Sequence, residues 1–415
     1  MKAIIALIAV VLMLTAGSTP AADWPQWRGP NRDGKSSDTG LLKEWPSEGP
    51  QLDWRATGLG SGYASVSVAD GRLFTMGDQG DSGYLIALNA ADGAILWTTE
   101  VGKSGAPEMV GYSYPGQRCT PTVSGDLVFA IDPWGEMICV NAVDGTEHWR
   151  KKFVSDFGSE PPTWGYSESP LVDGDQVVVT PGGPRGAMVA LDKRTGRLLW
   201  QSSDFTDEAH YASIVPTEIS GTRQYVQLTG TSVAGISAND GALLWQVPRQ
   251  GRYAVIPTPV VAGNQVYVTS GYNIGCNLFR VTPRADEFSV EQVYAERHMS
   301  NEHGGVIKVG DYLYGYFDSP GFACQNFQTG EIVWAEKEKV EKGCVSYADG
   351  MLYCRGEDSG TMTLVYASPD GYQEEGRFAQ PHRARENAWP HPSIANAKLY
   401  LRDQDILLCY DVKAE

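Results

Sequence analysis

The chain contains an eleven-residue unit that occurs five times with identical internal spacing, and this repeat restricts the possible folds more than any other feature. Each copy has a short apolar run ending in Asn, Asp or Ser, a Gly four residues later, and a Trp at the end of a second run. The copies are Ala87–Trp97, Cys139–Trp149, Ala190–Trp200, Gly235–Trp245 and Cys324–Trp334.

The unit has a direct structural interpretation. The Asn, Asp or Ser side chain can accept a hydrogen bond from the backbone two residues on, and the Gly supplies the positive φ of a tight turn. The unit is therefore predicted to be a strand, a turn and a strand. Its first residue is small in every copy, as expected where a Trp from the same or the neighbouring unit packs tightly against it.

Three weaker copies extend the series, at 280–294, 366–378 and 409–411, and the last of them lacks its outer strand. The segment Gln51–Trp54 can supply that strand. The aromatic positions are then 40 to 52 residues apart, at Trp54, Trp97, Trp149, Trp200, Trp245, Tyr294, Trp334 and Phe378. Such a period, with several strands per unit, is typical of a β-propeller that eight units would close.

A second predicted hairpin precedes each unit, which gives four strands per blade. The inner strands are expected at 64–68, 119–123, 169–172, 213–219, 258–261, 304–309, 344–347 and 392–394. The prediction is an all-β, eight-bladed β-propeller of four-stranded blades over residues 51–415, as one domain. Its ring is closed by the strand near Trp54, which pairs with the C-terminal blade.

The N-terminus has the layout of a secretory signal peptide: Met1 and Lys2, an apolar run over 3–14, and then small residues. We expect 1–22 to be removed by cleavage near Ala22, and the protein to be periplasmic or secreted. The alternative, a membrane anchor, needs about 20 apolar residues, and this run is shorter. Since no Cys precedes Cys119, we expect no lipid anchor.

Residues 23–50 are rich in Pro and Gly and contain Trp24 and Trp27, so they are predicted to be neither helix nor strand. The two Trp side chains need a surface against which to bury. We interpret the segment as an N-terminal arm packed across one face of the ring, where it closes the channel or seals the closure seam. A partner-docking motif is the alternative.

The formal charge of −17 argues against nucleic acid and anionic lipid surfaces as partners. We expect a monomer that binds a protein or an extracellular ligand. Among the seven cysteines, Cys344 and Cys354 flank one predicted turn and are the favoured disulfide pair. The alternative for all seven is a small buried apolar side chain.

The loops that enter the inner strands of a propeller share one face, around the mouth of the channel, and here they are long and aromatic. The candidate ligand-binding residues on this face are Arg118, Trp164, Glu168, His210, Tyr211, His303, Trp389 and His391. Polar residues could also gather there only to satisfy a wet channel. Metal-site and catalytic spacings are missing from the sequence, so no metal ligand and no catalytic residue is predicted.

The repeated unit, above all 190–200, resembles the tryptophan-docking repeat of pyrrolo-quinoline quinone (PQQ) proteins. The stretch 23–30 resembles the start of secreted PQQ-like propellers of planctomycete-type bacteria. The resemblance implies the eight-bladed fold over nearly the whole mature chain. One branch, the quinone-dependent alcohol dehydrogenases, carries an adjacent Cys-Cys pair and a calcium site. Another is the outer-membrane assembly propeller, a lipoprotein scaffold. This chain has neither adjacent cysteines nor a lipid-attachment Cys.

Three functions follow from these features. The prediction is a non-catalytic binding or scaffold propeller without a cofactor, which recognises a protein or an extracellular ligand on the channel face. The alternative is a PQQ- and calcium-dependent oxidoreductase with an atypical site, for which ring stacking on Trp164 or Trp389 beside Arg118 would be the sign. A third hypothesis is an enzyme that acts on polysaccharide at the aromatic mouth.

Overall fold

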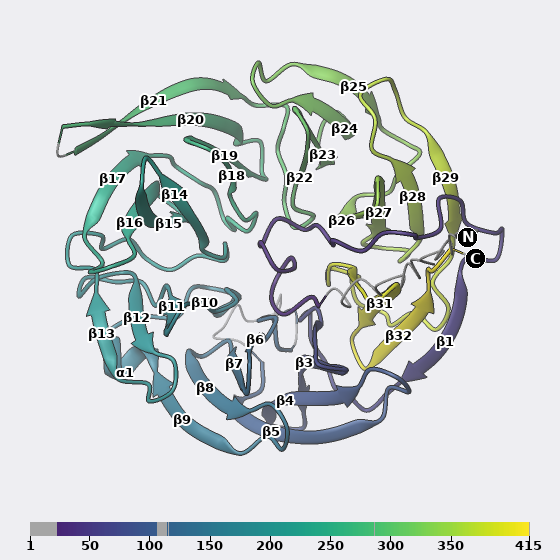
Figure 1. Ribbon diagram of the computed structural model, residues 1–415, viewed down its shortest axis with the longest axis horizontal. Helices are drawn as coiled ribbons and strands as arrows, with labels where there is room; N and C mark the ends of the chain where they lie inside the picture. The colour runs from purple at the N-terminus through teal and green to yellow at the C-terminus, as the bar shows by residue number, and fades with distance from the viewer. Residues whose placement is uncertain (1–22, 106–113, 115, 286, 415) are drawn as a thin grey trace, which may run out of the picture.

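The computed structural model describes residues 23–105, 114, 116–285 and 287–414. Their strands form eight four-stranded antiparallel sheets, which stand around a central channel as the blades of a propeller (Figure 1). Within the described part, the only helix is the short α1 (Phe153–Phe157). The prediction of an all-β, eight-bladed propeller with four-stranded blades is therefore confirmed.

We number the blades 1 to 8 along the chain and give their strands from the channel outward. Blade 1 is β2 (Ser67–Ala69), β3 (Arg72–Gln79), β4 (Ser82–Asn89) and β5 (Ile95–Lys103), and blade 2 is β6 (Thr122–Ser124), β7 (Leu127–Ile131), β8 (Glu136–Asn141) and β9 (Glu147–Lys152). Blade 3 is β10 (Leu171–Asp173), β11 (Gln176–Val179), β12 (Val189–Asp192) and β13 (Leu198–Gln201). Blade 4 is β14 (Val215–Ile219), β15 (Thr222–Leu228), β16 (Ser232–Ser237) and β17 (Leu243–Pro248).

Blades 5 to 8 follow the same plan. Blade 5 is β18 (Val260–Ala262), β19 (Gln265–Ser270), β20 (Gly275–Arg284) and β21 (Glu287–Glu296), and blade 6 is β22 (Ile307–Val309), β23 (Tyr312–Phe317), β24 (Gly321–Asn326) and β25 (Ile332–Glu336). Blade 7 is β26 (Gly343–Ala348), β27 (Met351–Gly356), β28 (Met362–Tyr366) and β29 (Glu374–Phe378). Blade 8 is β30 (Ser393–Ala395), β31 (Lys398–Asp403), β32 (Ile406–Asp411) and β1 (Gln51–Ala56).

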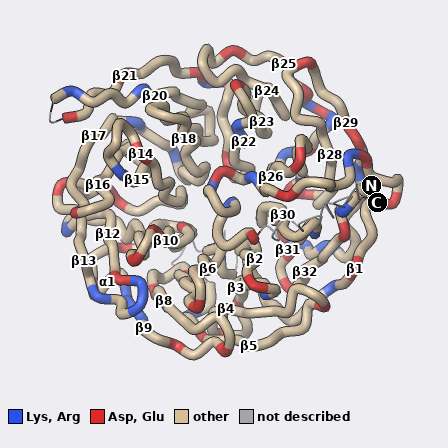
Figure 2. The backbone as a smooth tube through the Cα atoms, viewed as in Figure 1, with Lys and Arg blue, Asp and Glu red and all other residues tan. Residues whose placement is uncertain are grey.

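The core lies between blades. The middle strands are buried on both faces, so they read as continuous apolar runs, as in Leu127–Ile131 of β7, where all five residues are buried. The outermost strands are largely exposed on one face, as in β5, where burial alternates along Trp97–Val101, because only one of their faces meets the neighbouring blade. In Figure 2 the Lys and Arg residues are interspersed with Asp and Glu around the ring.

The repeated unit forms the outer hairpin of its blade. The small residue lies opposite the Trp of the same copy, as Cys139 does with Trp149. A Cβ added to Gly235 would lie 2.1 Å from the indole of Trp245. A register shift follows the small residue in all five copies. The side chain packed on the small position is therefore the Trp of the same unit, rather than that of a neighbour.

Most of the docking aromatic residues also pack on the turn of the next blade. Trp149 Nε1 donates a hydrogen bond to the backbone oxygen of Lys193 at 3.0 Å. A Cβ added to Gly196 would lie 2.8 Å from the indole ring, so the repeated Gly is required for close approach as well as for its positive φ. The same ring-on-glycine contact joins Trp54 to Gly93, Trp97 to Gly145, Trp200 to Gly241 and Tyr294 to Gly330.

Two tryptophans depart from this pattern. The hairpin that follows Trp245 has ten-residue strands and no docking glycine, and Trp245 Nε1 donates instead to Gln224 Oε1 of its own blade. Trp334 keeps its hydrogen bond to the Ser368 backbone oxygen at 2.9 Å. A Cβ on Gly371 would meet nothing within 4 Å, so Trp334 lacks the glycine contact.

The ring closes as predicted. β1 pairs with β32, and Trp54 lies opposite Cys409. Because blade 8 takes its outer strand from the N-terminal part of the chain, no hairpin turn follows β32 to cover Phe378 of blade 7. Gly49, just before β1, takes the place of the docking glycine, and a Cβ there would lie 2.5 Å from the Phe378 ring. Trp45 packs edge-on against the same ring.

The N-terminal arm enters the channel instead of only crossing one face (Figure 1). Trp24 makes backbone hydrogen bonds with Val68 of β2. Arg28 donates to the backbone oxygen of Val306 at 2.7 Å, and Arg32 donates to that of Ser169. Val68 lies in β2, Val306 directly precedes β22, and Ser169 lies two residues before β10, so the arm contacts the inner strands and their entries as well as crossing the ring.

The favoured disulfide is wrong. All seven cysteines are free and buried. Cys344 lies opposite Arg355, and Cys354 lies opposite Val345. Since successive residues of a strand point to opposite faces, the two thiols lie on opposite faces of the sheet. The predicted signal peptide, 1–22, lies outside the described residues. In the part of the chain that is described, no helix combines the length and the apolarity that crossing a membrane requires.

Candidate functional site

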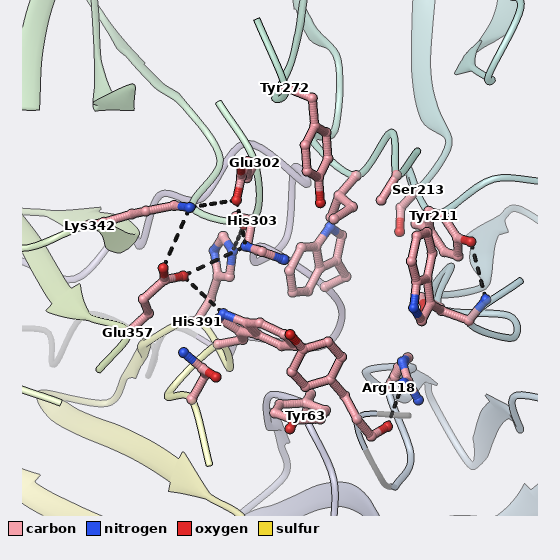
Figure 3. Close-up of a pocket in the computed structure, with 18 residues that line it drawn as sticks. Tyr63, Arg118, Tyr211, Ser213, Tyr272, Glu302, His303, Lys342, Glu357 and His391 are labelled. Carbon is pink, nitrogen blue, oxygen red and sulfur yellow. Dashed lines mark hydrogen bonds and ion pairs between the residues drawn. The ribbon is translucent and has the colours of Figure 1, made fainter. Parts of the chain in front are cut away.

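The loops that lead into the eight inner strands meet at one end of the channel and enclose a cavity of about 350 Å³ (Figure 3). We call this cavity the mouth pocket. Every blade contributes a lining residue from such a loop, and the arm contributes Trp27. Its walls are mainly aromatic: Trp27, Tyr63, Tyr114, Trp164, Tyr211, Tyr272 and Trp389. An apolar cavity with a few converging polar groups is the usual form of a ligand site.

A charged cluster occupies one side of the mouth pocket. Lys342 Nζ lies 2.5 Å from Glu302 Oε2 and 3.5 Å from Glu357 Oε1. Trp389 Nε1 donates to the second oxygen of Glu357 at 2.9 Å. Burial raises the pKa of Glu357. Burial alone would lower the pKa of Lys342, but the hydrogen bond to Glu302 and the charge of Glu357 raise it. The lysine thus pairs with both carboxylates, and the cluster keeps a formal charge of −1.

Two neutral histidines lie beside this cluster. The ring of His303 stacks on Trp389, with centroids 4.3 Å apart and planes 15° apart. Its Nδ1 is 3.7 Å from Glu357, yet burial and the charge of Lys342 lower the pKa of His303 to about 3. His391 Nε2 donates to the backbone oxygen of His303 at 2.9 Å, and burial lowers its pKa to about 3 as well. Both rings are therefore uncharged at pH 7.

The opposite side of the pocket carries Arg118 (Figure 3). Its guanidinium donates to the backbone oxygens of Tyr114 at 2.6 Å and Gly116 at 2.8 Å, and it lies 5.9 Å from the ring centroid of Tyr63. Burial lowers the pKa of Arg118. These backbone contacts fix the guanidinium in place at the edge of the aromatic wall.

Six of the eight predicted binding residues line the mouth pocket: Arg118, Trp164, Tyr211, His303, Trp389 and His391. Glu168 does not, because its carboxylate turns into the protein and accepts hydrogen bonds from the backbone and hydroxyl of Thr180. Burial raises the pKa of Glu168 to about 7. His210 lies outside the pocket too, where its Nδ1 accepts from the backbone N–H of Val255.

Sequence reasoning missed several lining residues. Tyr272 and Glu357 come from loops between the second and third strands of blades 5 and 7, and no site residue was predicted in these loops. Lys342 directly precedes β26, and nothing in its local sequence distinguishes it from a surface lysine. Its partner Glu302 directly precedes His303, which was a predicted site residue. Pairing oppositely charged residues between the entering loops of neighbouring blades could have identified Lys342 and Glu302.

The described residues do not fit a quinone–calcium centre. Calcium takes about six to eight oxygen ligands, usually several of them carboxylates. Glu302 and Glu357 are already paired with Lys342. Within the described ranges, no group of three or more His, Cys, Asp or Glu is placed to hold a metal. The two lining serines are also engaged: Ser167 donates to the Gly165 backbone oxygen, and Ser213 accepts from the Ser169 backbone N–H.

Comparison with known proteins agrees with this architecture. The family profile described as "Outer membrane protein assembly factor BamB" matches residues 43–130 and 114–336. A curated protein of that name from Burkholderia pseudomallei (strain K96243) is 26% identical over 247 residues, which are 57% of this chain and 58% of that protein. The match thus spans less than two thirds of the curated relative.

Solved structures show the fold alone. The quinohemoprotein alcohol dehydrogenase from Comamonas testosteroni superposes with a TM-score of 0.61 at 10% identity, over 95% of this chain and 81% of that one. The computationally designed Ika8 protein gives 0.56 at 11% identity, over 87% and 99%. With the repeat, the closed eight-bladed ring and the profile match across most of the propeller, the chain belongs to the family of the outer membrane protein assembly factor BamB.

Proposed function

We propose that this protein is a non-catalytic recognition propeller that holds its ligand in the mouth pocket, in the periplasm or outside the cell. The observation that carries the proposal is the pocket itself, whose aromatic walls surround two cations and two carboxylates, with formal charges that sum to zero. Such a site can bind and orient a ligand, but it offers no activated nucleophile among the described lining residues.

Acid–base chemistry finds little support in the same geometry. Both histidines keep a pKa of about 3, far from the operating pH that suits a general acid or base, so each is only a weak base near neutral pH. Glu302 and Glu357 both lie within ion-pair distance of Lys342, whose charge opposes the rise that burial causes in the pKa of Glu357. A general acid would need one of them to be protonated at the working pH.

The family supports a scaffold role. The curated relative is named an outer membrane protein assembly factor, and the signal-like N-terminus of this chain agrees with work in the cell envelope. The quinone-dependent alternative rests on the fold shared with quinohemoprotein alcohol dehydrogenases. The pocket chemistry does not favour it, because the carboxylates that a calcium ion would need are already paired.

The test is a binding and turnover assay on the purified mature protein. Trp27, Trp164 and Trp389 line the pocket, so tryptophan fluorescence reports its occupancy. We expect a panel of oligosaccharides and peptides to contain a ligand that changes this fluorescence and is recovered chemically unchanged. PQQ with calcium should give no calorimetric signal. Micromolar quinone binding with dye-linked alcohol oxidation, or conversion of the bound ligand, would overturn the proposal.

A further inference from the structure

We propose that the ligand of the mouth pocket is a neutral, linear oligosaccharide that runs from the pocket across blades 3 and 4 to Tyr253. This inference rests on the binding function proposed above and adds the chemical class and the path of the ligand. Three observations carry it: a continuous series of cavities, an exposed aromatic residue held at their outer part, and charges that are compensated within the protein.

The mouth pocket continues outward as a groove. Tyr211 lines both the mouth pocket and a second cavity of about 300 Å³, which is bounded by Pro161 and Pro162. His210 and Tyr253 line both this second cavity and a third one of about 250 Å³. Adjacent cavities thus share their walls. A compact ligand would use only the first cavity, whereas a chain molecule can use all three.

Tyr253 is held where it can act as a platform in this groove. Its side chain is 60% exposed, and its backbone lies in the left-handed region with φ of 57°. A bulky residue rarely adopts that conformation, and such strain is concentrated at functional sites. The ring of Tyr272 packs edge-on against the Tyr253 ring, with the two centroids 5.2 Å apart, and the guanidinium of Arg252 lies 4.8 Å from the centroid of the Tyr253 ring. Both contacts fix an aromatic ring that still faces solvent.

Aromatic platforms suit sugar rings. A pyranose presents C–H bonds on its faces, which pack against the negative face of an aromatic ring, and hydroxyls at its edge, which both donate and accept hydrogen bonds. The mouth pocket supplies the half-buried Trp164 as a platform, and Lys342 and Glu302 supply a donor and an acceptor. Tyr211 and Tyr253 continue the aromatic surface along the groove.

The charges favour a neutral chain. The mouth pocket is lined by two cations, Lys342 and Arg118, and two carboxylates, Glu302 and Glu357, so its formal charges sum to zero and a charged ligand would meet groups of both signs. Farther out, Glu160 and Glu208 line the groove and would repel an acidic polysaccharide. Hydroxyl groups can bond to paired charges without separating them.

A peptide is the less favoured occupant. Extended peptides gain much of their affinity by pairing with an exposed strand edge. The inner strands are the edges nearest to the mouth, and the arm already pairs with several of them: Trp24 with Val68, Pro25 with Val123, and Ser36 with Tyr347. The pocket walls that remain are mostly side chains, which suits a ligand recognised by its faces and hydroxyls.

Calorimetric titration tests the inference. The probes are cello-, xylo- and chito-oligosaccharides from the disaccharide to the hexasaccharide, with hexagalacturonate, an arginine-rich hexapeptide and a proline- and aromatic-rich hexapeptide as the competing classes. We expect at least one neutral series to bind, with an affinity that rises about tenfold or more from the disaccharide to the hexasaccharide as the groove fills.

Tyr253→Ala separates the groove from the pocket. We expect it to weaken hexasaccharide binding about tenfold and to leave disaccharide binding unchanged, because the short ligand occupies only the mouth pocket. Tyr366→Ala is the matched control, since Tyr366 is 45% exposed and lies by the Gly350 turn, at the other end of its blade from the mouth. This control should bind like the parent protein.

The outcomes separate the two proposals. Peptide or hexagalacturonate binding that quenches the pocket tryptophans, without any neutral oligosaccharide binding, would overturn this inference and leave the recognition function standing. The extended path would be overturned if the affinity for neutral oligosaccharides did not depend on their length. It would also be overturned if the Tyr253→Ala variant bound every length as tightly as the parent protein does. If no probe of any class changes the pocket fluorescence, both the inference and the recognition function fail.

Discussion

The outer docking hairpins and the mouth pocket are built in opposite ways. Each docking Trp is positioned by the same short unit, in the same register and with the same turn. The mouth pocket takes its residues from eight entering loops, two other loops and the arm, and no two of these loops share a sequence. The docking hairpins repeat the same packing contact from blade to blade, whereas each loop of the mouth pocket has its own sequence.

This difference teaches where stability and recognition are located. A docking Trp contacts its own blade and the next one, so its loss leaves a cavity in the inter-blade core. A mouth aromatic such as Trp164 contacts Tyr211 and solvent, and its removal leaves the blades intact. Repetition therefore marks the residues that close the ring, and departure from repetition marks those that can bind a ligand.

Trp149→Ala and Trp164→Ala test this contrast most strongly. Trp149 is 8% exposed, donates a hydrogen bond to the next blade and packs on Gly196, so its truncation should lower the free energy of unfolding by about 3–5 kcal/mol. Trp164→Ala should cost about 1 kcal/mol or less. Urea unfolding followed by circular dichroism measures both. Equal losses would show that the mouth is as much a part of the core as the docking hairpins.

Gly145→Ala and Gly125→Ala separate docking from backbone strain. Both glycines have positive φ, of 73° and 60°. A Cβ on Gly145 would lie 2.6 Å from the Trp97 ring, whereas one on Gly125 would meet nothing within 4 Å. We expect Gly125→Ala to cost about 1 kcal/mol. Gly145→Ala should cost about 1–3 kcal/mol more through overpacking. Matching midpoints in urea would mean that the turn conformation alone explains the repeated glycine.

Glu168→Gln probes a mouth-loop residue that belongs to the core. The native pKa of Glu168, about 7, is raised above the ordinary 4.5, mainly by burial. The native state thus binds this proton more tightly than the unfolded state does. The contribution of Glu168 is complete below pH 4.5 and is lost as the pH rises through 7. As the pH rises from 4.5 to 7, the free energy of unfolding of Glu168→Gln should therefore increase by about 1–3 kcal/mol relative to that of the parent.

The control for this experiment is Glu208→Gln, because Glu208 is an exposed carboxylate of the neighbouring blade. This variant removes one carboxylate at the surface and so controls for the loss of a charge as such. Denaturant unfolding at each pH gives both differences. A Glu168→Gln difference that is flat with pH would mean that the carboxylate is ionised in the native state throughout this range.

The cysteines give the smallest expected effect. Cys139, Cys324 and Cys409 occupy the small position opposite an aromatic docking residue, and all seven thiols are buried. A thiol reagent should titrate none of them in the native protein and all seven in denaturant. A reductant should leave the thermal midpoint unchanged. A midpoint that falls with reductant would revive a disulfide and contradict the register of β26 and β27.

The sequence by itself determined the ring. A fixed spacing of small residue, turn, glycine and Trp specifies a hairpin locally, and its recurrence every 40 to 52 residues gives the number of blades. The missing last strand pointed to Gln51–Trp54, and the pairing of Trp54 with Cys409 confirms it. These features were predictable because each depends on contacts within one hairpin or on counting copies.

Only the tertiary structure decided the pocket. Lys342 and Glu302 meet across 40 residues and two blades, and Gly49 covers Phe378 because no hairpin turn follows β32. Glu168 and Trp389 both lie in loops that enter inner strands, yet Glu168 turns inward to Thr180 while Trp389 lines the pocket. Such contacts depend on how loops of different lengths pack around the arm in the channel, and no local pattern in the sequence encodes that packing.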